Sequence, residues 1–223
     1  MESAALDLLA GAGRSERPPG FDLSGRYAGE MSLPEVQRIH DHYRDIDTPG
    51  IFAAALARSG YHGRNFMYGD TAVPVIYRLL QRIGADSEDV FFDLGCGCGM
   101  PVLTASMLVK KAVGIDLIPG AIQFCRLSQA ALGLDNVEFR TGDLLRTNLT
   151  EASIVFVAAT AFDFLGALRE RLLTVRPGTV VVSVTHSFEA PSLQLVESIP
   201  MEFSWTREGT DYPFRFHVHR RLP

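Results

Sequence analysis

The sequence has few cysteines, no long apolar run and no excess of basic residues. Its three cysteines, Cys96, Cys98 and Cys125, form no CxxC pair, so we expect neither a disulfide framework nor a metal site. No apolar stretch reaches the roughly 18 residues that a membrane span needs, and the N-terminus lacks the basic-then-apolar pattern of a secretory signal. We therefore expect a cytoplasmic protein without a membrane partner.

The charge balance is acidic. The 223 residues include 21 Lys and Arg against 26 Asp and Glu, which gives a net charge of −5. Proteins that neutralise nucleic-acid phosphates need a basic stripe, whereas the basic cluster of this chain is the short "HVHRR" near its C-terminus. The composition makes nucleic acid an unlikely partner and leaves the oligomeric state unknown.

The order of sequence patterns predicts three parts. Residues 1–25, rich in Gly, Pro, Ser and Arg, predict a loosely ordered leader. Residues 26–85 read as a helical lid or substrate-binding region, in which Ser32 and Glu35 have the spacing of a capping box. Residues 86–223 alternate short apolar strands with helical stretches and end in two apolar runs without a helix between them. This order predicts an α/β fold, with a doubly wound, mainly parallel seven-stranded sheet and a C-terminal antiparallel hairpin.

The stretch "DVFFDLGCGCGMPVL" indicates a ligand site. A predicted strand ends near Asp93 and continues into Gly95, Gly97 and Gly99, at the first strand-to-helix turn, where open α/β sheets bind ligands. Glycines there let a ligand approach the backbone. A dinucleotide fingerprint needs a small third residue, and Met100 at that position disfavours NAD or FAD. The pattern acid-x-Gly-x-Gly-x-Gly resembles motif I of class I S-adenosylmethionine-dependent methyltransferases, which makes S-adenosyl-L-methionine the expected cofactor.

Two further acids follow the next predicted strands. Asp116 ends the second strand, where this fold places a carboxylate that binds ribose hydroxyls. Asp143 follows the third strand, where it either accepts a hydrogen bond from the adenine amino group or caps the next helix. Leu117 and Leu144, which come directly after these acids, complete this part of the predicted cofactor site.

Five blocks of the chain, across roughly residues 65 to 221, resemble the disruptor-of-telomeric-silencing family of non-SET histone-lysine methyltransferases. In order they are "FMYGDT", "FFDLGCGCG", "SIVFVAATAF", "LRERLLTVRPGTVVVS" and "FSWTREGTDYPFRFHVHRR". The resemblance implies a class I, Rossmann-like methyltransferase. It implies that a loop covers the cofactor, formed by Tyr68, Gly69, Asp70 and Thr71. It also implies that Trp205, with Tyr212 or Phe214, reaches the acceptor channel.

The chain departs from this family where the acceptor would bind. The family has two asparagines after the fourth strand, and here the matching residues are Ala158 and Ala159; the basic segment that holds nucleosomes is absent. Three hypotheses about the site remain open: a protein lysine or similar amine as acceptor, a small metabolite as acceptor, and a non-catalytic partner protein that binds the cofactor. A nucleotide-dependent oxidoreductase is a further class, which Met100 disfavours.

Methyl transfer from a sulfonium requires alignment and a dry channel more than it requires reactive side chains. An amine acceptor must arrive deprotonated, and aromatic walls favour its neutral form. The candidate walls are Trp205, Tyr212, Phe214 and Phe162, each of which also reads as ordinary packing. Candidate general bases are Asp70, His217 and His186, of which His186 at the end of the fifth strand is best placed, although a lone histidine is often structural.

Overall fold

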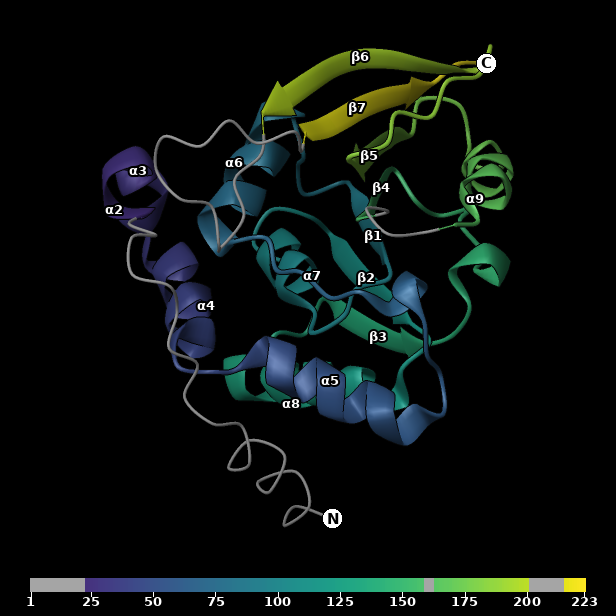
Figure 1. Ribbon diagram of the computed structural model, residues 1–223. Helices are drawn as coiled ribbons and strands as arrows, with labels where there is room; N and C mark the ends of the chain where they lie inside the picture. The colour runs from purple at the N-terminus through teal and green to yellow at the C-terminus, as the bar shows by residue number, and fades with distance from the viewer. Residues whose placement is uncertain (1–22, 159–162, 201–214) are drawn as a thin grey trace.

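The structure, a computed structural model, describes residues 23–158, 163–200 and 215–223 and contains a central seven-stranded sheet (Figure 1). The strand order is β3-β2-β1-β4-β5-β7-β6. The first five strands pair in parallel, and β7 pairs antiparallel with both β5 and β6. The strand bounds are β1 Val90–Leu94, β2 Lys111–Asp116, β3 Val137–Thr141, β4 Ile154–Val157, β5 Val180–Val184, β6 Leu193–Pro200 and β7 Arg215–Arg221. The predicted fold class is confirmed, including the C-terminal hairpin.

Helices cover both faces of this sheet. Successive side chains of a strand point to opposite faces, so each strand contacts both helical layers. On β1, Phe91 points to the face covered by α4 to α8, whereas Phe92 points to the face covered by α9. Each face is apolar, which is typical of a parallel sheet buried between two helical layers. The helices are α2 Leu23–Arg26, α3 Ala28–Met31, α4 Pro34–Arg44, α5 Thr48–Ser59, η1 Arg64–Phe66, α6 Val73–Arg82, α7 Met100–Ala105, α8 Pro119–Leu132, η2 Leu144–Arg146 and α9 Leu165–Leu172.

The N-terminal helices share one hydrophobic core with the sheet. Val36 and Ile39 of α4 and Ile76 of α6 are buried in the same cluster as Phe91 and Phe156. Figure 1 shows α4, α5 and α6 around one side of the sheet, with α5 lying across α8. The division at residue 85 into a lid or substrate-binding region and a catalytic domain therefore stays a proposal. It concerns what the two parts do, because they pack around a shared core. None of the helices in the described residues is long and apolar enough to cross a membrane.

The predicted capping box at Ser32 is wrong. The N-cap of α4 is Leu33, which makes no side-chain capping bond, and Pro34 opens the helix. The Ser32 hydroxyl instead donates to the carbonyl of Gly29, 2.7 Å away. Ser32 therefore closes the preceding helix α3, which the sequence pattern did not reveal.

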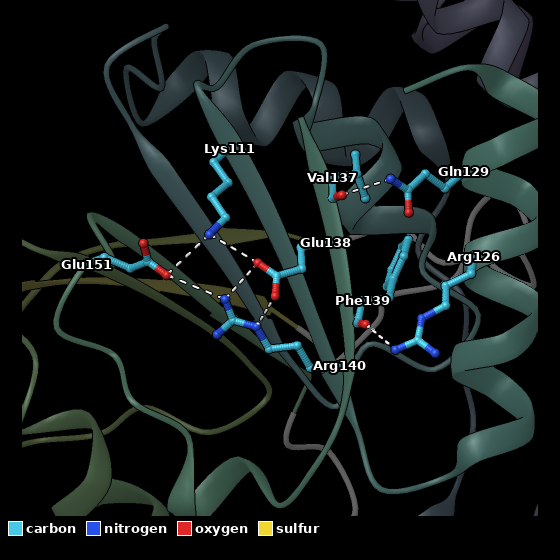
Figure 2. Close-up of polar contacts among 8 residues, drawn as sticks. All are labelled: Lys111, Arg126, Gln129, Val137, Glu138, Phe139, Arg140 and Glu151. Carbon is cyan, nitrogen blue, oxygen red and sulfur yellow. Dashed lines mark hydrogen bonds and ion pairs between the residues drawn. The ribbon is translucent and has the colours of Figure 1, made fainter. Parts of the chain in front are cut away.

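The two faces of edge strand β3 are held by different contacts (Figure 2). On one face, Glu138 pairs with Arg140 at 2.6 Å and with Lys111 of β2 at 3.1 Å. Toward α8, Arg126 and Gln129 donate hydrogen bonds of 2.8 Å to the carbonyls of Phe139 and Val137, respectively. These side chains satisfy backbone acceptors that would otherwise lie free at the sheet edge.

Glu138→Gln should lower the free energy of unfolding by about 0.5 to 1 kcal/mol at pH 7, the range for a partly exposed ion-pair network. The hydrogen bond from Arg140 lowers the pKa of Glu138 from 4.5 to about 2. A lowered folded-state pKa means that the stabilisation is complete above the unfolded value and is lost as the pH falls toward 2. Urea unfolding across this pH window measures the difference, with Glu170→Gln as control, because Glu170 pairs only with its neighbour Arg169 among the described residues. An equal loss in the control would contradict the prediction.

Candidate active site

A pocket of about 270 Å³ lies at the carboxyl ends of β1, β2 and β4, beneath the segment that joins α5 to α6. Almost all of the predicted cofactor residues line it: Tyr68, Gly69, Asp70, Thr71, Asp93, Gly95, Gly97, Asp116, Leu117 and Leu144. The structure therefore brings the "YGDT" loop, the glycine loop and the end of β2 around one cavity.

The glycine loop uses its glycines for close packing with the protein itself. Gly97 has a φ of +53°, and a Cβ added there would lie 2.6 Å from Cε2 of Tyr68. Gly99 has a φ of +81°, and its Cβ would lie 2.9 Å from Sγ of Cys125 and from the ring of Phe139. Left-handed φ values and close neighbours both require glycine at these positions. The space at Gly97 that the sequence pattern assigned to the ligand is thus filled by Tyr68.

The "YGDT" loop closes over the glycine loop through a small polar network. The hydroxyls of Tyr68 and Thr48 both donate to the carboxylate of Asp70. The Tyr68 ring stacks on Phe52 of α5 at a centroid distance of 4.8 Å. Burial, and next the Asp70 carboxylate, raises the pKa of Tyr68 well above its usual value, so this hydroxyl stays protonated and donates. Asp70 is therefore held by two donors beside the pocket.

A second set of contacts, from α4, α5 and α8, holds the glycine loop in place. The hydroxyl of Tyr43, at the end of α4, donates to the carbonyl of Cys98 at 2.8 Å. The thiol of Cys98 lies 3.6 Å from the carbonyl of Thr48, and the thiol of Cys125 lies 3.2 Å from the carbonyl of Gly97. Burial raises the pKa of the Cys96 and Cys98 thiols, which keeps them uncharged and poorly nucleophilic. The cysteines pack and orient the loop.

Two buried carboxylates, Asp93 and Asp116, lie near the carboxyl ends of the neighbouring strands β1 and β2. Asp116 accepts hydrogen bonds of 2.9 Å from the backbone N–H groups of Gly97 and Ile118. Asp93 is 1% exposed, and its Oδ1 has no hydrogen-bond partner among the described residues. Burial first, and the Asp116 charge second, raises the pKa of Asp93 well above its usual value. An unpartnered acceptor next to a second carboxylate fits a ligand group that donates hydrogen bonds and carries positive charge.

The described residues that line the pocket include three carboxylates and no Lys, Arg or His. Apolar and aromatic side chains also line it, among them Phe66, Met67, Phe156, Ala158 and Phe164. Elsewhere in the described residues, no cluster of three or more His, Cys, Asp or Glu side chains could hold a metal ion. The cavity therefore combines acidic side chains with apolar and aromatic ones.

Some predicted residues lie away from this pocket or outside the described residues. Asp143 caps η2 by accepting a hydrogen bond from the N–H of Leu145 at 2.9 Å. Gly99 lies against Cys125 and Phe139 and is not among the described residues that line the pocket. His186 is half-buried two residues beyond β5 and is not among the described residues that line the pocket. The predicted residues that fall outside the described part of the chain are Trp205, Tyr212, Phe214, Ala159 and Phe162.

Several pocket residues had no signal in the sequence. Phe52 lies on the inner face of α5, and Asn65 and Phe66 belong to the short helix η1. Phe164 immediately precedes α9, packs against the core on the α9 face of the sheet and also lines the pocket. Only the tertiary fold brings these segments together, so residue type and spacing could not identify them. Gly142 could have been inferred, because it precedes Asp143 at the end of β3.

Comparisons with known proteins agree with this geometry. Residues 53–204 match the family described as histone methylation protein DOT1. A protein-lysine N-methyltransferase of Saccharolobus islandicus is 32% identical over 143 residues, which cover 60% of this chain and 84% of that protein. The H3 lysine-79 specific histone-lysine N-methyltransferase of Drosophila melanogaster is 30% identical over 52% of this chain but only 7% of its own length.

A solved structure extends the range of acceptors among similar proteins. An RNA methyltransferase from Salinibacter ruber, in complex with S-adenosyl-L-homocysteine, superposes with a TM-score of 0.54 and 27% identity. The match covers 69% of this chain and 94% of that chain. The expectation that nucleic acid is an unlikely partner is therefore not supported by these comparisons, whereas the expected cofactor is. The chain belongs to the DOT1 family of histone methylation proteins and is an S-adenosyl-L-methionine-dependent methyltransferase.

Proposed function

We propose that this methyltransferase acts on an amine nitrogen, the side chain of a protein lysine. The observation that carries the proposal is the pocket composition: three carboxylates, no basic side chain and several apolar and aromatic side chains among the described residues. Such a cavity favours cationic or donor-rich groups near the acids, and it disfavours a charged ammonium wherever apolar side chains surround it. The lysine methyltransferase of Saccharolobus islandicus and the Drosophila histone enzyme support the same acceptor class.

The carboxylates would hold the cofactor, which supplies an electrophilic methyl group on a sulfonium. Asp93 would accept a hydrogen bond from the cationic amino group of the cofactor. This bond would offset the free-energy cost of burying Oδ1, which has no partner among the described residues. Asp116 would accept from the ribose hydroxyls with the lone pairs that its two backbone donors leave open. Gly95 and Gly97 would place the backbone beside the cofactor, and Tyr68 would keep the loop in place.

The apolar and aromatic side chains would prepare the acceptor. Phe66, Phe156 and Phe164 line the pocket beside Ala158, so an amine that enters there exchanges water for aromatic surface. Removal of water lowers the pKa of an amine and so yields the neutral nucleophile that in-line transfer requires. Ala158 leaves space where the family has an amide side chain. Asp70 accepts hydrogen bonds from two hydroxyl groups, which limits the capacity of Asp70 to act as a general base.

A small-molecule acceptor is the second candidate, favoured by Ala158 itself. A side chain without polar atoms makes no hydrogen bond to hold a peptide-borne amine, and the space beside it suits a bulkier acceptor. The two candidates differ in the size class of the methylated product.

The test uses the purified protein, methyl-labelled S-adenosylmethionine and a cell lysate, from which protein, nucleic acid and small molecules are separated. We expect label in the protein fraction, resistant to nuclease and recovered as methyl-lysine after hydrolysis. Asp93→Asn, which removes the acceptor charge with little change in size, provides the inactive control. Label that nuclease removes, or label confined to small molecules, would contradict the lysine proposal.

A further inference from the structure

We propose that the surface formed by residues 58–67 docks an acidic segment of the protein that carries the acceptor amine. The inference rests on the proposed function, because it names the sequence context in which that function finds its lysine. The surface, called the rim segment below, comprises the end of α5, the turn after it, η1 and the residue that follows. Figure 1 shows this part of the chain running from the end of α5 toward the carboxyl ends of the strands.

The rim segment is basic in an otherwise acidic chain. Arg58, His62 and Arg64 are all exposed. No Asp or Glu occurs between Asp47 and Asp70, although acids outnumber Lys and Arg by 26 to 21 in the whole chain. A run of this kind concentrates positive potential beside the pocket.

The arginines of the rim segment are not neutralised within the described structure. Neither Arg58 nor Arg64 forms an ion pair with another described residue. Asp163 does bond to the rim segment, but through Asn65. The Asn65 side-chain NH₂ donates to the Asp163 carboxylate at 2.8 Å, and the backbone N–H of Asp163 donates to the Asn65 side-chain oxygen at 2.9 Å. That carboxylate is engaged by an amide, so no carboxylate of the described residues neutralises either guanidinium group.

The rim segment also exposes apolar surface that is continuous with the pocket wall. Met67 is 70% exposed and Tyr61 is 44% exposed. The Tyr61 ring stacks on Phe66 at 5.3 Å, and both Phe66 and Met67 line the pocket. Exposed apolar side chains next to unpaired arginines are typical of an interaction surface.

Charge selects an acidic protein segment as the occupant. Strong electrostatic binding of nucleic acid comes from many phosphate contacts, for example about 6 to 10, whereas the rim segment supplies three basic side chains. The same cations disfavour a protonated lysine at the pocket mouth. Carboxylates that flank the lysine would supply the missing attraction and let the amine enter in its neutral form.

The test compares two fluorescent peptides that carry a central lysine, one flanked by glutamates and the other by glutamines. Binding is followed by fluorescence anisotropy with S-adenosylhomocysteine present, at low and high salt. We expect tighter, salt-sensitive binding of the glutamate peptide. The double variant Arg58→Glu with Arg64→Glu should weaken this binding at least about tenfold, because like charges then face each other.

A matched control keeps the comparison specific. Arg176 is exposed and lies in the turn before β5, at the amino ends of the parallel strands and so opposite the pocket. Arg176→Glu changes the net charge but leaves the rim segment intact, so it should bind the glutamate peptide as the wild type does. All variants should bind S-adenosylhomocysteine equally, which shows that the fold is retained.

Three outcomes decide the inference. Equal binding of the two peptides, or an equal loss in Arg176→Glu and the double variant, would overturn it. Stronger binding of a single-stranded RNA oligonucleotide, lost in the double variant, would assign the surface to RNA and overturn the protein partner. Mass spectrometry of the peptide lysine tests the proposed function separately: selective binding without methylation would reject the lysine acceptor while the docking surface stands.

Discussion

Gly97→Ala should weaken the binding of S-adenosylmethionine by about 100-fold or more. The residue occupies the left-handed region at φ +53°, where a non-glycine residue costs about 1 to 3 kcal/mol. The new Cβ would also meet the Tyr68 ring at 2.6 Å. Tyr68 cannot retreat without losing its stacking on Phe52 and its bond to Asp70, so the loop and its cover would separate.

Isothermal titration with the cofactor measures this effect, and Gly133→Ala provides the control. Gly133 ends α8 with a φ of +57°, and a Cβ added there would have no heavy atom within 4 Å. The control carries the same backbone strain without the clash, so it should lose stability in urea but keep its affinity. If Gly97→Ala binds the cofactor as tightly as the control does, the contact with Tyr68 has no role in binding.

Asp116→Asn should weaken cofactor binding by about 10- to 100-fold. Each carboxylate oxygen already accepts a backbone N–H, from Gly97 on one side and Ile118 on the other. An amide would turn its NH₂ group toward one of these donors and leave a buried N–H unsatisfied, at a cost of about 1 to 3 kcal/mol. The substitution also removes the charge proposed to bind the ribose hydroxyls.

The matched variant is Asp143→Asn. Both residues lie at the carboxyl end of a parallel strand, but Asp143 caps η2 and pairs with Arg146 at 3.6 Å. Its replacement should leave the affinity within a few fold of the wild type, because the Asn oxygen can still accept from the N–H of Leu145 and the lost pair with Arg146 is exposed. Equal losses in the two variants would mean that Asp143 also reaches the cofactor, as its place in the sequence suggested.

Local patterns were sufficient to predict the sheet and to place Asp93 and Asp116 at the carboxyl ends of neighbouring strands. Strand β1 occupies Val90–Leu94, and β2 ends at Asp116. Such predictions succeed because an apolar run bounded by an acid and glycines leaves few alternatives for a buried parallel strand. The carboxyl ends of parallel strands meet at one edge, so Asp93 and Asp116 were bound to lie near each other.

Contacts between distant segments could not be predicted in this way. The hydroxyl of Tyr43 reaches a carbonyl 55 residues away, and Asn65 bonds Asp163 across 98 residues. Nothing in the local pattern of either segment encodes its partner. At Ser32 the pattern was misleading, because a serine hydroxyl bonds equally well to the end of the preceding helix.

The hydrogen bond from Tyr43 to the carbonyl of Cys98 links the stability of helix α4 to the affinity for the cofactor. The peptide that it holds is part of the glycine loop, while Tyr43 itself is 1% exposed in the core beside α8. Loosening of α4 would therefore free the loop, and a bound cofactor would in turn resist that loosening. Substitutions in the first helices, far from any ligand atom, would thus change cofactor affinity, and natural variation there would tune the enzyme without altering its pocket.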